Sequence, residues 1–333
     1  DFVATACWGV ASQPIGFALG YTAMGLVANL KDRPWWRTIL AGLCVGMNVI
    51  EAADIGAIFS VFVGSWVVAH AFAQEGSFVQ RAGRGAARFI LVAGFAACIA
   101  TSAISVLVGT VVKGVVGTAQ DDKTKAMRWS EATQWSLPKR EFVSLFVPGF
   151  YGFRMDTPSQ LPEWQQKAFA DGAYWGFTGR GAEWDQFLAS DRKGGLPGNF
   201  LRYGMGSGYM GMLIWLAGFW AMVQSFRRNS FFNRGQKLLI WFWLGVLVVS
   251  TGLMFGRHAP FYAWFYQLPY VSTIRNPAKF MHVFSWALII VAGYGLHGLT
   301  TLYLDKAVAS GKGVVENFNL WWRKESGFDK KWV

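Results

Sequence analysis

The sequence predicts an all-α, multi-spanning membrane protein with about seven transmembrane helices and one large insert outside the membrane. Of the 333 residues, 53% are hydrophobic and only 15% are charged, whereas soluble domains carry about a quarter charged residues. The charges cluster between long uncharged stretches, and a helix needs roughly 20 apolar residues to cross a bilayer. The 18 Trp residues fit the same class, because Trp and Tyr collect at membrane interfaces.

The formal net charge of +12 has a simple interpretation in such a protein. The basic residues stand in short loops beside apolar stretches, where they set the topology and meet anionic lipid headgroups. We therefore expect membrane lipids as partners and no nucleic acid. Cys7, Cys44 and Cys98 lie in apolar stretches without a CxxC pair, which argues against disulfides and zinc and predicts no metal site of that kind.

Residues 1–117 are expected to form four crossings. The stretch 38–74 is interrupted only by Glu51 and Asp54. As one helix it would reach about 55 Å, which is too long for a single crossing. Basic residues flank both of its ends, so we expect a hairpin with the two acids at its outer tip. A re-entrant loop fits the same pattern equally well.

The insert covers 118–207, and residues 208–304 are expected to form three further crossings. The insert is rich in Trp, Gly and Pro and has no long apolar run. Long loops are usually functional or disordered, and the aromatic content argues against disorder. The remaining residues, 305–333, are predicted to be a basic cytoplasmic tail whose Trp-containing part fits the inner membrane interface. Because the chain begins at Asp1 rather than Met, we expect it to be part of a longer protein.

The loop 256–279 is cationic although it falls on the predicted outer side, against the positive-inside tendency. It contains Arg257, His258, Arg275 and Lys279 and no acid. The last two precede a helix whose free N–H groups can bind an anion, and the fork of Arg matches phosphate oxygens. A lipid-phosphate site formed by these four side chains is one interpretation. Simple anchoring to lipid headgroups is the other.

Glu51 and Asp54 are three positions apart and could share one helix face. Carboxylates at membrane depth tend to be functional, so the pair could act as a general base or hold a divalent cation. A solvated loop tip is the alternative. His282 and His297 lie fifteen apart, nearly on one helix face, and could bind a pigment, although a helical His is more often hydrogen-bonded to a neighbour.

Aromatic side chains accompany Gly and Pro in the insert. Such side chains suit stacking against sugar rings, and they suit a domain lying on a membrane interface equally well. The candidates for contact with a sugar or an acceptor are Trp135, Tyr151, Tyr174 and Trp175.

Six short stretches carry a resemblance to a known family: 41–47, 145–152, 174–176, 209–211, 274–280 and 293–296. In this order they resemble the bacterial YfhO-like membrane proteins, whose fold belongs to the GT-C class of polytopic glycosyltransferases. The stretch from Arg275 to Phe280 matches the family pattern Arg-x-Pro-x-Arg/Lys-Phe, with Lys279 where Arg is commoner. Glu51 and Asp54 stand where a Gly-His-Pro-like stretch is expected.

The resemblance implies a glycosyltransferase in the bacterial plasma membrane. Such an enzyme takes a sugar from a polyprenyl-phosphate donor and places it on a cell-envelope acceptor, with the insert on the extracytoplasmic side. The catalytic acid of such folds usually lies in the first outer loop, which would precede Asp1. A non-catalytic subunit of a larger membrane complex, accessory or pigment-associated, is the second hypothesis. A transporter or flippase is the third, because no repeat is visible.

Overall fold

The computed structural model describes residues 12–30, 33–106, 109, 121–133, 135–148, 186, 190, 209–269, 271–304, 313–324 and 327. Within these residues the regular structure is helical and contains no strand. Four of the described segments are long and apolar enough to cross a membrane: α4 (Ala53–Ala73), α5 (Phe78–Val106), α10 (Arg234–Met254) and Pro277–Tyr303, which contains α12 (Phe280–Leu299). The helical class and the presence of helices long and apolar enough to span a membrane, both predicted from the sequence, are thus confirmed for the described residues.

The predicted number of seven crossings is larger than the number of helices that meet these criteria in the described part of the chain. Helices α2 (Ser12–Ala28) and α9 (Met212–Phe226) are apolar but shorter. The 15 residues of α9 reach about 22 Å, less than the hydrocarbon thickness of a bilayer. Helix α3 (Pro34–Glu51) has 18 residues and includes Arg37 in its first turn.

The stretch 38–74 forms α3 and α4, which are separated by a single residue, Ala52. The backbone of Ala52 leaves the helical region at φ −145° and ψ 82°. A Cβ at Gly56 would come within 2.5 Å of the backbone of Val49, so the turn between the helices is tight. The expectation that Glu51 and Asp54 share one helix face is therefore wrong, because the chain changes direction between them.

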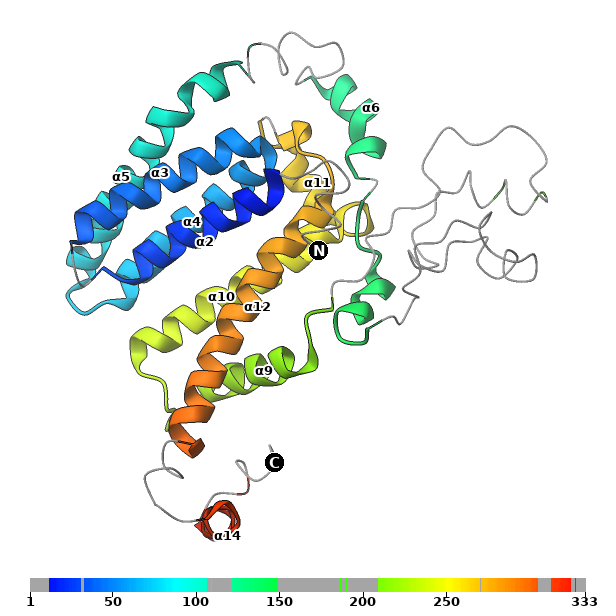
Figure 1. The fold of residues 1–333 in the computed structure, drawn as a ribbon. Coiled ribbons are helices and arrows are strands. Elements are labelled where there is room, and N and C mark those ends of the chain that lie inside the picture. The colour runs from blue at the N-terminus through cyan, green and yellow to red at the C-terminus, as the bar shows by residue number, and fades with distance from the viewer. Residues whose placement is uncertain are drawn as a thin grey trace.

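The helices form two groups, which Figure 1 shows side by side. The first group contains α2, α3, α4 and α5, and the second contains α9, α10 and α12. They meet where α4 packs on α10, with the rings of Trp66 and Trp243 5.2 Å apart. They also meet where Trp286 of α12 lies against Tyr21 and Phe59 at 4.1 and 4.0 Å between ring centroids.

Short helices close one end of the bundle. They are α6 (Asp122–Ala132), η2 (Lys139–Leu145), η5 (Gly256–His258), α11 (Pro260–Gln267), η6 (Val271–Thr273) and η7 (Pro277–Lys279). The tip between α3 and α4 lies at this end too, because Asp54 contacts Lys279. The start of the predicted insert, the acidic tip and the cationic loop are thus neighbours in space.

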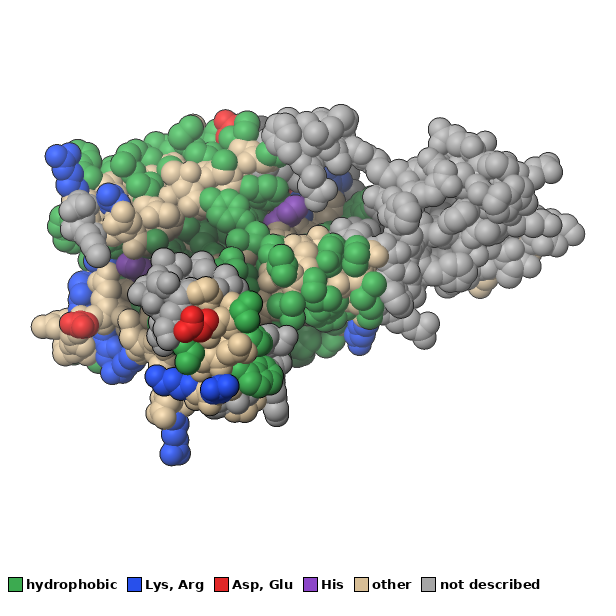
Figure 2. Space-filling view, turned by 60° about the horizontal axis from the view of Figure 1, so that its bottom comes forward, with side chains coloured by type: hydrophobic (Ala, Val, Ile, Leu, Met, Phe, Trp, Pro, Cys, Tyr) green, Lys and Arg blue, Asp and Glu red, His purple; other side chains and the backbone are tan. Residues whose placement is uncertain are grey.

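Basic side chains gather at the other end of the bundle. Arg37 binds the carbonyl of Asn29, Arg81 that of Phe72, and Lys237 that of Arg227. In Figure 2 many of the blue side chains lie on the left and lower part of the view. Beyond α12 the chain continues through the π-helical turn η8 (Thr300–Leu304) and later forms α14 (Val314–Lys324).

Candidate functional site

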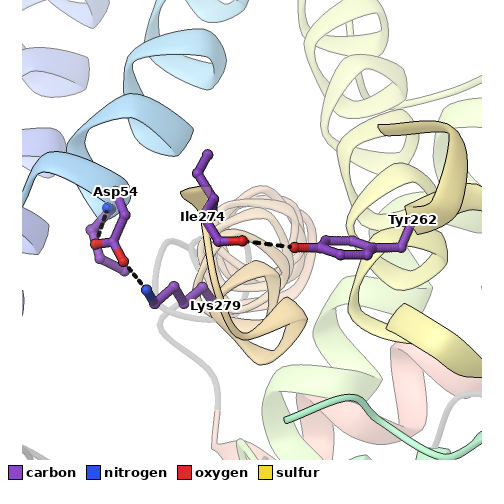
Figure 3. A network of polar contacts seen from close by, with 5 residues as sticks. Asp54, Tyr262, Ile274 and Lys279 are labelled. Atoms are coloured by element: carbon purple, nitrogen blue, oxygen red, sulfur yellow. Dashed lines mark hydrogen bonds and ion pairs between the residues drawn. The ribbon is translucent and has the colours of Figure 1, made fainter. Parts of the chain in front are cut away.

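The side chains of Asp54 and Lys279 form an ion pair between the two groups of helices (Figure 3). Asp54 stands in the first turn of α4, where its Oδ1 accepts a hydrogen bond from the backbone N–H of Ile55 at 2.7 Å. Lys279 ends η7 and leads into α12. The Lys279 side chain is 12% exposed and that of Asp54 39% exposed. The cation is therefore largely desolvated, whereas its carboxylate partner remains partly exposed.

The backbone before Lys279 turns sharply to present this cation. Asn276 adopts a left-handed conformation at φ 67°, which Asn tolerates better than most residues. The hydroxyl of Tyr262 on α11 donates a hydrogen bond to the carbonyl of Ile274 at 3.3 Å (Figure 3). Burial, with Tyr266 nearby, raises the pKa of Tyr262, so the hydroxyl keeps its proton for this bond.

The predicted phosphate-binding side chains occupy different settings around this turn. Arg275 is exposed, Arg257 and His258 are partly buried in η5, and Lys279 faces Asp54. The structure thus places all four in the short segments at one end of the bundle. Lys279 forms an ion pair with Asp54 of the acidic tip, and the sequence patterns did not predict that pairing.

The start of the insert is attached to the cationic loop through backbone hydrogen bonds. The N–H of Asn276 donates to the carbonyl of Ala132 at 2.8 Å, and the N–H of Ala278 donates to the carbonyl of Trp135 at 2.9 Å. Leu137 donates in turn to the carbonyl of Met254 at 2.8 Å. Trp135, a candidate for sugar contact, is therefore bonded through its backbone to Ala278, the residue that directly precedes Lys279.

Side chains strengthen the same attachment. The hydroxyl of Tyr266 donates to the carbonyl of Lys125 at 3.0 Å, and the ammonium of Lys125 donates to the carbonyl of Gln267 at 3.2 Å. A Cβ at Gly256, where φ is 51°, would lie 2.0 Å from Oγ of Ser136. The insert's first segment and the loop therefore form one packed unit, in which a larger residue at Gly256 has no room.

An open apolar groove of about 1240 Å³ begins beside the ion pair. It runs between α4 and α10 and is bordered by α11, η6 and the start of α12. Asp54 is the one charged residue among its described lining residues, and Ser65 lies eleven positions further along α4, which is about 16 Å at the rise of a helix. The rest of the lining is almost entirely hydrophobic and includes Ile58, Phe62, Trp241, Val246, Phe265 and Phe280.

The structure separates the remaining candidates from this site or leaves them outside the described residues. Glu51 ends α3 and is exposed. His282 packs on Phe17 and His297 on Phe231, at 4.4 and 5.7 Å between ring centroids, so the two histidines do not form one site. Among the described residues no group of three His, Cys, Asp or Glu side chains could hold a metal ion. The other three aromatic candidates, Tyr151, Tyr174 and Trp175, lie outside the described residues.

The arrangement combines an apolar groove with a carboxylate in its lining, Asp54, and that carboxylate is paired with the ammonium of Lys279. A ligand with a long apolar chain and an anionic head matches this combination, since the chain can bury its surface while the head meets cations. The volume exceeds the usual range of about 300–1,000 Å³ for small-molecule pockets. The search of protein-family models, of curated proteins and of solved structures gave no match to this chain.

Proposed function

We propose that this protein binds a polyprenyl-phosphate-linked sugar and transfers the sugar to a cell-envelope acceptor, as a glycosyltransferase of the GT-C kind. The observation that carries the proposal is the apolar groove whose lining includes Asp54, the partner of Lys279 in an ion pair. The groove receives the polyprenyl chain. The phosphate lies at its end, within reach of Lys279 and the loop that carries Arg275.

The charges have a defined role in this reaction. An acceptor hydroxyl attacks the sugar carbon that is bonded to the phosphate oxygen, that C–O bond breaks, and polyprenyl phosphate leaves with the bonding electrons. Cations positioned at the leaving phosphate stabilise the negative charge that develops on it. Asp54 is the carboxylate among the described residues that line the groove and is the candidate to take the proton from the acceptor. Trp135, on the attached start of the insert, is the aromatic candidate for the sugar.

Binding of undecaprenyl phosphate to the purified full chain in nanodiscs tests the first half of the proposal. We expect Arg275→Ala and Lys279→Ala each to weaken binding about tenfold or more, since hydrogen bonds to charged groups contribute about 1.5–3 kcal/mol. Arg228→Ala, in the loop between α9 and α10, is the matched control and should leave binding unchanged. Equal affinity of the wild type for undecaprenol and its phosphate would rule out the phosphate site.

Transfer is tested separately, with a panel of polyprenyl-phosphate hexoses and isolated envelope acceptors. We expect Arg275→Ala to abolish release of polyprenyl phosphate while the protein stays folded. A second candidate function is a non-catalytic, lipid-binding subunit of a larger complex. It is favoured by the ion pair itself, because the groove's carboxylate is already engaged by Lys279. Tight binding of the lipid phosphate without turnover of any donor would support that candidate instead.

A further inference from the structure

Helix α14 (Val314–Lys324) has two chemically different faces. At 100° per residue, Val315, Phe318, Trp321 and Trp322 fall within about 120° of one another. The opposite side carries Glu316, Asn319 and Arg323, with Leu320 as its apolar exception. Such a division is typical of helices that lie in a membrane interface with the apolar face toward the acyl chains.

The apolar face of α14 is substantially exposed in the described structure. Val315 is 74% exposed, and Phe318 and Trp322 are each 45% exposed. The rings of Phe318, Trp321 and Trp322 lie 5.7 to 6.0 Å apart and form one aromatic cluster. A cluster of this kind suits the headgroup region, where aromatic side chains are half buried and half wet.

The orientation of α14 favours a bilayer surface as the occupant of this face. Figure 1 shows α14 end-on, while α10 and α12 run along the picture, so α14 lies across the direction of the bundle helices. It stands beyond the C-terminal end of α12, and Trp321 contacts Tyr303 of η8 with ring centroids 5.8 Å apart. A helix that follows a membrane-spanning segment and lies across its direction runs along the membrane surface.

The charge of this end of the bundle indicates which lipids are bound. Helix α14 ends with Arg323 and Lys324. The loop that joins α9 to α10, where Arg227 and Arg228 follow α9, packs near the end of α12, because Phe231 contacts His297. Clustered cations beside a membrane-spanning helix attract anionic headgroups.

We propose that α14 is a surface anchor that inserts Val315, Phe318 and Trp322 into the bilayer interface and binds anionic lipid headgroups through Arg323 and Lys324. The anchor is separate from the ion pair, which lies at the opposite end of the bundle, and from the groove, whose described lining contains no residue of α14. It fixes the depth of α12 in the membrane through the contact between Trp321 and Tyr303.

Spin labels on the full chain in nanodiscs test the anchor. In a background where Cys7, Cys44 and Cys98 are replaced by Ala, one label is placed by Phe318→Cys and a matched one by Glu316→Cys on the polar face. We expect the label at 318 to collide mainly with oxygen and the label at 316 mainly with a water-soluble nickel chelate. Equal access of both labels to the chelate would overturn the proposal. So would protection of the label at 318 from both reagents, because that result would mean that a protein surface covers the face.

The lipid preference has its own test. We place the double variant Arg323→Gln and Lys324→Gln in nanodiscs that contain phosphatidylglycerol. We expect the ratio of membrane-inserted to released α14, followed by the 318 label, to fall by roughly fivefold per charge removed. Nanodiscs of phosphatidylcholine alone should show no such difference between the variant and the parent. A difference of the same size in both lipid compositions, or in neither, would overturn the assignment to anionic headgroups. Binding of undecaprenyl phosphate should be unchanged in this variant, which distinguishes loss of the anchor from loss of the groove site.

Discussion

The ammonium group of Lys279 donates a hydrogen bond to the carboxylate of Asp54, which lies 225 positions earlier in the chain. The pair joins the first turn of α4 to the residue that precedes α12. It therefore holds the two groups of helices together at the end where the apolar groove begins. Its two members are unequally buried, so the loss of either partner should have a different effect on stability.

Removing the acid should destabilise the protein more than removing the base. Asp54→Asn leaves the largely buried cation of Lys279 without a counter-charge, whereas Lys279→Met leaves Asp54 partly solvated. Breaking a fully buried pair costs about 3–5 kcal/mol; with one partner exposed we expect about 1–3 kcal/mol for Asp54→Asn and less for Lys279→Met. Unfolding by SDS from mixed micelles measures both.

The double variant Asp54→Asn and Lys279→Met completes the cycle. We expect it to be less destabilised than the sum of the two single variants, because the uncompensated charge is gone. If the double variant lost as much stability as the two single variants together, the two side chains would not interact in the membrane-embedded protein.

The crossing of α9 and α12 depends on Gly295. A Cβ at this position would lie 2.0 Å from the carbonyl oxygen of Ala217, a backbone atom that cannot move aside alone. Gly295→Ala should therefore push the helices apart and cost about 1–3 kcal/mol, the usual range for overpacking. Gly293→Ala is the control, because a Cβ there has nothing within 4 Å. It should be neutral or slightly stabilising, and equal melting curves for both variants would contradict the packing.

Filling the groove should block lipid binding without damaging the fold. Gly245 lines the groove on α10, and a Cβ at this position has nothing within 4 Å. Gly245→Phe is expected to lower the affinity for undecaprenyl phosphate at least tenfold, because the ring occupies the space of the chain. Gly94→Phe, on α5 and equally open, is the matched control. If both variants bind like the parent protein, the chain of the ligand lies elsewhere.

The pH dependence of α6 should follow Asp121. Its carboxylate accepts hydrogen bonds from the N–H of Thr124 at 2.9 Å and from the Thr124 hydroxyl at 2.7 Å, and these bonds lower the pKa of Asp121. Because the pKa of Asp121 is lowered in the folded state, its carboxylate stabilises the helix at pH values above the ordinary pKa of 3.8. That stabilisation is lost as the pH falls through the folded-state pKa. Hydrogen exchange of residues 121–133, corrected for intrinsic rates, should therefore accelerate below about pH 4.

Asp121→Asn is the control for this titration, since the amide keeps an acceptor for the helix N-terminus but carries no titrating charge. We expect its exchange in 121–133 to be independent of pH over the same range. An identical acceleration in Asp121→Asn and in the parent protein would assign the effect to another group.

The sequence predicted the helical membrane class because uncharged runs of sufficient length are visible directly in the chain. The count of crossings was less predictable, since α9 and α3 are short and only the structure shows where each helix ends. The error over Glu51 and Asp54 has a similar origin. The break falls on Ala52, a good helix former, so the residue type does not show that Glu51 ends one helix and Asp54 stands in the next.

The composition of the candidate site could be predicted in part. Lys279 and Asp54 were each selected from local patterns, but their pairing depends on helices that come together from distant parts of the chain. The attachment of Ala132 and Trp135 to Asn276 and Ala278 uses backbone hydrogen bonds, which leave no trace in residue type. The groove is likewise formed by five separate elements, so no single stretch of sequence reveals it.

The division into two helix groups bears on how the protein is made. Helices α2 to α5 pack mainly on one another, and roughly 100 residues separate Val106 from Met212. At about 5–20 residues per second, the ribosome needs about 5–20 s to reach α9. During that interval the side of α4 that will line the groove has not yet met α10. We expect a lipid chain to occupy this side first, and α10 to close over it when the second group is inserted.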